Sequence, residues 1–433
     1  MARKMKDSGI EWIGEIPEGW EIVPVRSCFD EVRTKNTDGQ EQNALQFKSG
    51  NIISKANFNA NTDDYVADTI TNYTVVLPDT VMINGLNLNY DFKSLRVALV
   101  KEKGVITSAY LAIFPDRKKI SPQYATYLFK GYETKMAFHN MGAGIRKTLG
   151  YKEFKNQPLL LPSEKEQNKI SAYLDSKCSH IDIMLSKIRS SIEEYKKLKQ
   201  AVITQAVTKG VRGEREMKDS GVEWIGEIPA EWSITKIKSG VTKIGSGKTP
   251  SGGAETYTDS GVIFLRSQNI YDCTLNLESP TYISSEVDAT MKSTRVLPDD
   301  VLLNITGGSI GRCSIVPKTL GLANVNQHVC IIRTNPLIFL PKYMQYFWVS
   351  TLGHLAIDLY QTGGNREGMS ADAIRNTPIP YAPLNEQKEI ADYLDAKCAE
   401  IDKLIAKKEQ LVKELESYKK SLIYEVVTGK REV

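Results

Sequence analysis

Long apolar runs, close cysteine pairs and clustered histidines are all missing from this sequence of 433 residues. No stretch approaches the roughly 18 apolar residues that a membrane-spanning helix needs, and the first residues lack the apolar segment of a secretory signal peptide. The six cysteines lie far apart and the four histidines are scattered, so the ligand spacing of a zinc site is absent. We therefore expect a reduced cytoplasmic protein with no membrane association, no metal site and no catalytic residues of its own.

A strong net charge of either sign is missing too. Lysine and arginine number 56 and aspartate and glutamate 52, which gives a formal net charge of +4. This weakly basic balance permits a nucleic-acid partner without requiring one. The length and the hydrophobic content of 41% indicate about two to four domains with a sizeable core.

What the sequence does contain is an internal repeat. Met5–Pro17 reads MKDSGIEWIGEIP and Met217–Pro229 reads MKDSGVEWIGEIP, an offset of 212 residues (217 − 5). A second block runs without a gap from about Gly142 to Thr208, and its copy lies 220 residues later (for example 366 − 146). Between these blocks the halves match poorly, from about 23 to 140 and from about 235 to 360. A shared frame with diverged interiors is expected if the interiors recognise different targets.

The C-terminal part of each half has the heptad spacing of a coiled-coil helix, with apolar residues alternately four and three positions apart. Lysines interrupt this spacing at Lys199, Lys408 and Lys419. A narrow apolar stripe needs a partner, so we expect the two helices to pair with each other; the alternative is that each packs on its own domain. The residues predicted for the seam of the pair are Leu174, Ile181, Leu185, Ile188, Ile192, Leu394, Ile401, Ile405, Val412, Leu415 and Leu422.

The order of the elements along the chain determines how such helices would run. Ser163-Glu164-Lys165-Glu166 predicts the start of the first helix as a capping box, and Gly210 and Gly429 fit the two ends. The first helix ends where the second domain begins, so the pair is predicted to be antiparallel, with one domain at each end. About 42 residues at about 1.5 Å each would span up to roughly 60 Å, which exceeds one turn of B-DNA at about 34 Å.

These observations predict an α+β fold with two mixed α/β recognition domains, separated by two long antiparallel coiled-coil helices and related by a pseudo-two-fold internal repeat. The predicted boundaries are residues 1–162 for the first recognition domain, 163–212 for the first helical region, 213–383 for the second recognition domain and 384–433 for the second helical region. Turn residues bound short strands in the interiors, predicted at Thr74–Leu77, Thr80–Asn84, Val97–Val100, Val262–Arg266, Asp300–Thr306 and Val329–Arg333.

Side chains suited to DNA lie near these strands. Asn and Gln can bond adenine, Arg and Lys can bond guanine, and either cation can hold phosphate. Arg146 and Arg366 recur at equivalent positions, which favours phosphate contact for both. Most polar loop residues contact only water, so we expect about one in three candidates to touch DNA. The candidates are Lys48, Asn51, Asn84, Asn87, Tyr90, Lys93, Arg96, Arg146 and Lys147 in the first half, and Lys248, Arg266, Gln268, Asn269, Asn304, Thr306, Arg312, Gln327, His328, Asn365 and Arg366 in the second.

Two motifs resemble catalytic signatures. The segment Gly245-Ser246-Gly247-Lys248-Thr249 resembles a phosphate-binding loop, but the first glycine of the pattern would fall at Thr242. Asp116 with Glu153 and Lys155 faintly resembles a metal-dependent nuclease, and the second half has no counterpart. An NTPase or nuclease is therefore a weaker hypothesis. A coiled-coil scaffold without a role in DNA binding is weaker as well, because it leaves both diverged interiors unexplained.

The repeated motifs resemble one known family. They are SG-x-EWIGEIP at Ser8–Pro17 and Ser220–Pro229, Gly144–Lys147 leading to Pro158–Pro162, and EQ-x-x-I-x-x-YLD-x-KC at Glu166–Cys178 and Glu386–Cys398. Together they are similar to the specificity subunit of type I restriction-modification systems, HsdS. The resemblance covers essentially the whole chain.

That resemblance implies two recognition domains that each read one half of a split, asymmetric DNA site, with no catalysis in this chain. The helices would set the spacer and bind two methyltransferase subunits, which use S-adenosylmethionine to methylate adenine in each half-site. Two translocase-nuclease subunits would join for cleavage, with ATP and Mg²⁺. Double-stranded DNA and these subunits are the expected partners, and this chain is expected to hold no cofactor.

Overall fold

The computed structural model divides the chain into two compact units, each of which is described by itself. Unit 1 comprises Met1–Arg189 and Gln410–Val433, and unit 2 comprises Ser190–Glu409. The structure describes residues 3–48, 50–55, 70–92, 95–144, 147–361 and 368–433.

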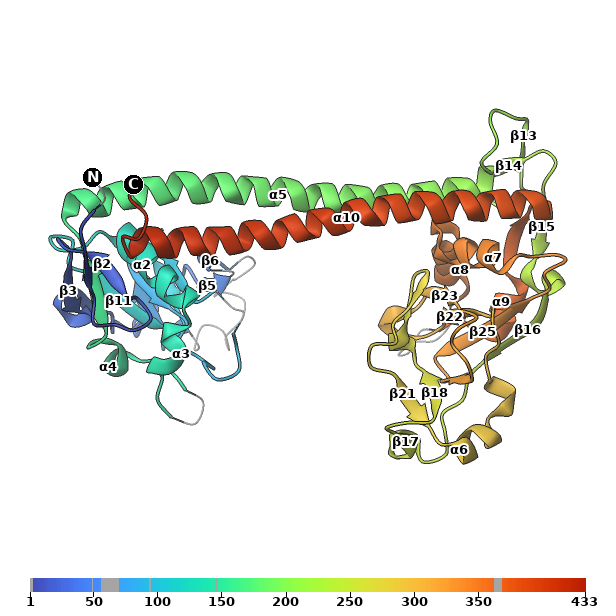
Figure 1. The fold of residues 1–433 in the computed structure, drawn as a ribbon, viewed down its shortest axis with the longest axis horizontal. Helices are drawn as coiled ribbons and strands as arrows, with labels where there is room; N and C mark the ends of the chain where they lie inside the picture. Colours follow the sequence, from blue (N-terminus) through green and yellow to red (C-terminus); the bar gives the residue numbers. More distant parts are fainter. Residues whose placement is uncertain (1–2, 49, 56–69, 93–94, 145–146, 362–367) are drawn as a thin grey trace. The chain divides into compact units, whose positions relative to one another are not determined.

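Unit 1 is built on a four-stranded antiparallel sheet with the strand order β4-β11-β8-β9. These strands are β4 (Phe29–Glu31), β8 (Val81–Ile83), β9 (Val97–Leu99) and β11 (Leu111–Pro115). Helix α2 (Pro122–Thr134) packs against β8 and β9 (Figure 1). Ser121 caps this helix by accepting a hydrogen bond from the amide of Tyr124, and Pro122 suits its first turn.

Shorter elements surround this sheet. The two ends of the repeated frame meet in one ladder, because β3 (Glu21–Pro24) pairs with β12 (Pro158–Leu161). The other elements are β1 (Met5–Asp7) with β2 (Glu15–Pro17), η1 (Val25–Ser27), β5 (Leu45–Lys48) with β6 (Asn51–Ser54), β7 (Thr74–Val76) with β10 (Gly104–Ile106), α3 (Ala137–Met141) and α4 (Tyr151–Phe154).

Unit 2 repeats the plan of unit 1 and adds to it. Its antiparallel sheet has the order β16-β25-β22-β23, formed by β16 (Val241–Ser246), β22 (Val301–Asn304), β23 (Cys313–Ile315) and β25 (Val329–Thr334). Helix α7 (Pro341–Val349) packs on β22, β23 and β25, in the same role as α2. A second sheet has the order β17-β21-β18-β24, with strands β17 (Tyr257–Thr258), β18 (Val262–Leu265), β21 (Thr281–Ile283) and β24 (Ala323–Val325).

The remaining elements of unit 2 complete its frame and loops. They are β13 (Met217–Asp219) with β14 (Glu227–Pro229), β15 (Ser233–Lys236) with β26 (Pro378–Tyr381), β19 (Ile270–Tyr271) with β20 (Thr274–Leu275), α6 (Ser285–Thr290), α8 (Thr351–Tyr360), α9 (Ala371–Asn376), η2 (Ile237–Gly240), η3 (Gly253–Thr256), η4 (Ser267–Asn269), η5 (Lys292–Thr294) and η6 (Gly307–Ser309).

The six strands predicted from the sequence are confirmed. They are β7, β8 and β9 in unit 1 and β18, β22 and β25 in unit 2. Their ends differ from the predicted ones by one or two residues. Both copies of the VLPD motif end in a left-handed turn, with φ of 76° at Asp79 and 68° at Asp299, so the repeat preserves a turn as well as a strand.

Two long helices carry the heptad pattern, as predicted. Helix α5 spans Glu164–Lys209 and helix α10 spans Leu384–Val427. The predicted helix start is confirmed, because Ser163 caps the helix: the amide of Glu166 donates to the hydroxyl of Ser163 at 3.4 Å. Gly210 and Gly429 follow the helices with φ of 73° and 70°, the left-handed conformation that ends a helix and that glycine adopts without strain.

Within unit 1 the two helices pack together along the predicted seam. Leu174, Ile181, Leu185 and Leu422 are buried in one core cluster, and Val412 and Leu415 pack against it. Ile188 is half-buried. The same cluster contains sheet and α2 residues, so the helices pair with each other and also pack on their domain. The two alternatives weighed from the sequence are therefore both realised.

The three lysines that interrupt the heptads contact the other helix, two through ion pairs and one through an aromatic ring. In unit 1, Lys419 Nζ lies 2.6 and 2.7 Å from the two carboxylate oxygens of Asp182. In unit 2, Lys199 makes the same pair with Asp402 at 2.7 and 2.6 Å. Lys408 lies 5.5 Å from the centre of the Tyr195 ring. Unit 1 has a second pair, between Arg189 and Glu416. In each unit the residue numbers rise along α5 as those of their partners fall along α10, so the antiparallel prediction is confirmed.

The seam of unit 2 is buried in the same way. Leu394 belongs to the main core cluster of this unit, beside Ile203 and Val207 of α5. Ile192 and Ile401 are buried, and Ile405 is half-buried. The observed fold is therefore the predicted α+β class, with two mixed α/β domains, two long antiparallel helices and a repeated internal plan.

A repeated cluster of arginine, tryptophan and glutamate fastens the start of each long helix to the frame. In unit 2 the Glu386 side chain is 0% exposed and lies 2.6 Å from Arg215 Nη1. Trp232 Nε1 donates to the other carboxylate oxygen at 2.9 Å. Arg215 also donates to the carbonyl of Lys209 at 2.6 Å. One arginine therefore joins the end of α5, the start of α10 and the frame tryptophan.

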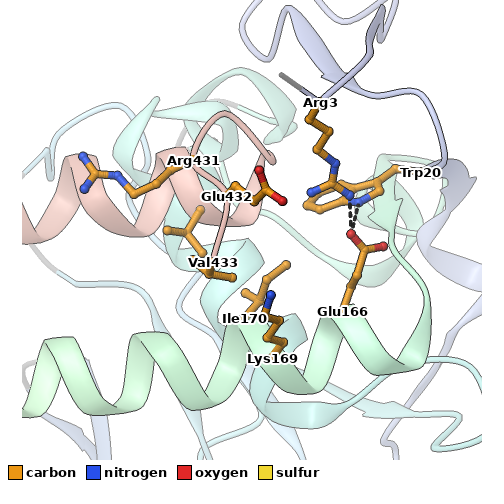
Figure 2. Close-up of a pocket in the computed structure, with 9 residues that line it drawn as sticks. Arg3, Trp20, Glu166, Lys169, Ile170, Arg431, Glu432 and Val433 are labelled. Carbon is orange, nitrogen blue, oxygen red and sulfur yellow. Dashed lines mark hydrogen bonds and ion pairs between the residues drawn. The ribbon is translucent and has the colours of Figure 1, made fainter. Parts of the chain in front are cut away.

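Unit 1 has the same cluster in a more open setting. Arg3 forms an ion pair with Glu166, and Trp20 Nε1 donates to the same carboxylate at 3.3 Å; Figure 2 shows both interactions converging on Glu166. The side chains of Arg3 and Glu166 are about one third exposed. The cluster borders a cavity of about 310 Å³ lined by Arg3, Trp20, Glu166, Lys169, Ile170, Val426, Arg431, Glu432 and Val433.

Removing the arginine should therefore be costly in unit 2 and mild in unit 1. We expect Arg215→Ala to lower the free energy of unfolding by about 3–5 kcal/mol, because it strands a buried carboxylate. Arg3→Ala should cost under about 1 kcal/mol, since its partner is partly hydrated. Urea denaturation followed by circular dichroism measures both. Equal losses in the two variants would contradict this difference in burial.

Candidate nucleic-acid interface

The β5–β6 hairpin of unit 1 presents two of the predicted residues together. Lys48 and Asn51 face each other in the register at the turn end of this hairpin, and both are exposed. A cation beside an amide can hold a phosphate and contact a base edge. The arrangement therefore suits the DNA contacts predicted for both residues.

The loop from Asn84 to Arg96 is held from inside by its last residue. Arg96 is only 1% exposed. Its guanidinium donates to the carbonyls of Asn84 at 2.8 Å and Leu86 at 2.9 Å, and to that of Asp91 at 2.5 Å. The predicted DNA contact of Arg96 is therefore wrong, because its donors are used within the loop that they stabilise.

This buttressed loop displays polar and aromatic side chains. Tyr90 is 74% exposed, and Asn87 is exposed with a left-handed φ of 53°. Asn84 is half-buried, and its side-chain oxygen accepts from the amide of Leu86 at 3.2 Å. Tyr90 and Asn87 thus remain available to a ligand.

Sequence reasoning overlooked an aromatic pair in the same unit. The ring of Phe92 stacks on His139 at 5.0 Å between ring centres. Forty-seven positions separate the two residues (139 − 92), so no local pattern signals the contact. The pair extends the exposed surface of the loop, since Phe92 is itself exposed.

A partly buried carboxyl anchors the end of this loop. Glu133 accepts a hydrogen bond from the backbone amide of Arg96. Loss of water around the carboxyl raises the pKa of Glu133 to about 7, and the hydrogen bond from Arg96 and the charge of Lys130 oppose that rise. The anchor therefore changes charge near neutral pH.

Three more candidates of unit 1 lie near or outside the described residues. Lys147 is exposed, with φ of 41°. Lys93 and Arg146 lie outside the described residues, and their DNA contacts stay predictions.

In unit 2 the turn η4 orients three candidates differently. Gln268 is exposed, and Arg266 is half-buried with its guanidinium 5.6 Å from the centre of the Tyr257 ring. Asn269 is buried, and its side chain bonds to the amide of Arg266 at 2.9 Å and the carbonyl of Asn276 at 3.0 Å. Asn269 thus shapes the turn that presents Gln268.

Asn304 at the end of β22 also faces inward. Its side chain is 0% exposed and donates to the carbonyl of Ser267 at 2.8 Å and the hydroxyl of Ser309 at 3.1 Å. Arg312 lies 4.7 Å from the ring centre of Tyr271. This stacking leaves the edge of the guanidinium able to donate to a phosphate or a base. No local sequence pattern signals the contact between Arg312 and Tyr271, because 41 positions separate the two residues (312 − 271).

The glycine-rich segment that resembles a phosphate-binding loop has a different structure. Strand β16 leads into it, and the turn η3 follows instead of a long helix. The backbone at Gly247 packs closely against β24, because a Cβ added there would collide with the carbonyl oxygen of Val325. Lys248 and Thr249 are exposed, so the segment presents a cation and a hydroxyl at the surface.

Thr249 joins a chain of hydrogen bonds that ends at Thr306. The hydroxyl of Thr249 donates to the Gln327 side-chain oxygen. The Gln327 side-chain nitrogen lies 3.1 Å from His328 Nε2, and His328 Nδ1 lies 2.6 Å from the Thr306 hydroxyl. Gln327, His328 and Thr306 were each predicted from the sequence as DNA contacts, but no sequence pattern indicates that they form one network. The last two candidates of unit 2, Asn365 and Arg366, lie outside the described residues, and their DNA contacts stay predictions.

Among the residues that the structure describes, metal-binding clusters and membrane-spanning helices are both absent. Within the described residues, no group of three histidine, cysteine, aspartate or glutamate side chains is placed to hold a metal ion. None of the helices that the structure describes is both long and apolar enough to cross a bilayer.

Comparisons with known proteins match this architecture. Residues 229–414 match the family model for the type I restriction modification DNA specificity domain. A putative type I restriction enzyme MjaX specificity subunit from Methanocaldococcus jannaschii is 25% identical over 96% of this chain and 95% of its own length. The MjaVIII specificity subunit of the same organism is 24% identical over 96% of this chain and 93% of its own length.

Two solved structures share the fold. One, from a study of complex assembly and conformational transition of the type I R-M system, has a TM-score of 0.70 and 15% identity, covering 96% of this chain and 99% of the other. The HsdS subunit from Thermoanaerobacter tengcongensis has a TM-score of 0.50 and 15% identity, covering 98% and 100% of the two chains.

The exposed lysine of the glycine-rich segment should act through charge alone. We expect Lys248→Ala to weaken binding to all duplex sequences by a similar factor and to lower the salt dependence of log Kd by about one ion. Fluorescence anisotropy over a series of salt concentrations measures this. Lys403→Ala, which alters an exposed lysine of α10, is the control. A loss confined to one DNA sequence, with an unchanged salt slope, would contradict the phosphate role.

Proposed function

Because this chain belongs to the specificity subunits of type I restriction-modification systems, we propose that its two units each read one half of a bipartite, asymmetric DNA site. The chain is a DNA-recognition subunit without catalysis of its own. The finer assignment, one half-site to each unit, is our inference from the internal repeat.

One observation carries this proposal: the same frame holds different loops in the two units. The four-stranded sheets share their strand order, and each is backed by one helix. Unit 1 presents the loop that Arg96 buttresses. Unit 2 presents the second sheet and the network of Thr249 and Gln327. Two units with the same sheet and helix but different exposed loops suit the recognition of two different DNA half-sites.

The long helices support the proposed spacer and docking roles. At about 1.5 Å per residue, the 46 residues of α5 extend for about 70 Å, roughly two turns of B-DNA. The helices also carry exposed apolar side chains that the seam does not use, which suit the docking of modification subunits. They are Ile183, Met184, Leu411 and Tyr418 in unit 1 and Leu198 and Tyr393 in unit 2.

The chemistry would belong to the partners. We propose two methyltransferase subunits that hold S-adenosylmethionine and act on an adenine flipped from each half-site. Two translocase-nuclease subunits would use ATP and Mg²⁺. This chain would contribute sequence recognition and the geometry of the assembly.

Exchange of one recognition interior tests the assignment of half-sites. Residues 20–160 would be replaced by the equivalent segment of a specificity subunit with another target. Adenine methylation, mapped by long-read sequencing of a host that expresses the complete system, should then show one changed half-site, with the other half-site and the spacer retained. The reciprocal exchange of residues 232–380 should change the other half. If either exchange altered both half-sites, the units would not read independently.

A further inference from the structure

The hydrogen-bond network around Gln327 orients one exposed amide in unit 2. Gln327 is exposed at the start of β25, next to half-buried His328. Its oxygen accepts from Thr249 and its nitrogen contacts His328 Nε2 at 3.1 Å. An exposed glutamine normally samples many rotamers, so a side chain held at both ends of its amide is unusual on a surface.

We propose that Gln327 is a specificity-determining residue that reads an adenine through the major groove, an inference that rests on the proposed DNA-recognition function. Asn and Gln recognise adenine by accepting from its N6 amino group and donating to its N7. The amide must be held in one orientation for these two hydrogen bonds. In the reverse orientation its nitrogen would face the N6 donor and its oxygen would face the N7 acceptor.

The hydrogen bonds that Gln327 already makes leave one acceptor and one donor of its amide unused. A carboxamide oxygen accepts two hydrogen bonds and its nitrogen donates two. Thr249 uses one site of the Gln327 oxygen, and His328 uses one hydrogen of its nitrogen. One acceptor site and one donor of this exposed amide remain unused by these two bonds, and an acceptor and a donor are the two groups that adenine needs.

The orientation is propagated inward through His328. When Gln327 donates to His328 Nε2, that nitrogen must be the acceptor, so the proton of the neutral ring lies on Nδ1. Nδ1 then donates to the Thr306 hydroxyl, which lies 2.6 Å away. The backbone amide of His328 is held as well, by the side-chain oxygen of Asn326 at 3.2 Å. The tautomer with its proton on Nδ1 is therefore the one that matches an amide nitrogen facing His328.

The glycine-rich segment places the other contact. The amide of Gly247 donates to the carbonyl of Val329 at 2.9 Å, and the amide of Lys248 donates to that of Val325 at 3.2 Å. This close approach tolerates only glycine at 247, because a Cβ would collide with the Val325 carbonyl. The segment that resembles a phosphate-binding loop thus brings Thr249 onto Gln327, with the cation of Lys248 beside it.

Binding-site selection from a randomised duplex library tests the inference, using the full chain assembled with the modification subunits of its system. The wild type should select a bipartite motif with an A·T pair whose identity depends on Gln327. Gln327→Glu should lose that preference by about tenfold or more and favour cytosine there, because a carboxylate accepts from cytosine N4. All other positions should be unchanged.

Two further variants separate base reading from a folding defect. Thr249→Val removes the hydroxyl that donates to Gln327 and should weaken discrimination at that same position while leaving the rest of the motif intact. Gln205→Glu makes the same chemical change at an exposed glutamine of α5 and should leave the motif unchanged. Circular dichroism confirms that each variant is folded.

Each remaining outcome overturns the inference. An unchanged motif in Gln327→Glu, a change at a G·C pair, or full discrimination in Thr249→Val would each do so while the bipartite motif, and with it the proposed function, stands. If the wild type selected no sequence at all, the proposed function would fall together with the inference.

Discussion

Apolar packing between α5 and α10 is the constraint on which the rest of the structure depends. In unit 1 the core cluster contains Leu422 and Val426 from the far end of the chain, and in unit 2 it contains Leu394 beside Ile203. Unit 1 completes its core only with residues from both ends of the chain, and the core of unit 2 needs residues of both α5 and α10. The ion pairs of Lys199 and Lys419 add register and little stability, since exposed pairs contribute under about 1 kcal/mol, whereas a buried leucine contributes several.

The repeated and the diverged parts of the chain have different roles: the repeated parts form the framework, and the diverged parts carry the candidate recognition residues. The repeated parts, the β3–β12 and β15–β26 ladders and the arginine–tryptophan–glutamate clusters, fasten the domains to the helices. The diverged parts carry exposed side chains that internal contacts orient. Buried Arg96 holds one loop and His328 holds one amide. Preorganised side chains lose less entropy when DNA binds, so this division favours discrimination between sequences.

The sequence predicted what depends on local pattern. Heptad spacing located the seam, and the capping box at Ser163 and the glycine at 210 located the ends of α5. It could not separate exposed from buried polar residues of the same type, so Asn304 and Gln327 looked alike although only the latter is exposed. It also missed the stacking of Arg312 on Tyr271, because tertiary packing of β19 near β23 brings these distant positions together.

We propose that the helix pair sets the distance between the two half-sites. Insertion of one heptad after Arg189 in α5, matched by one after Glu409 in α10, keeps the seam in phase within each unit and lengthens both helices by about 10 Å. Methylation mapping should then show unchanged half-sites with a spacer longer by about three base pairs. An unchanged spacer in an active complex would contradict the claim.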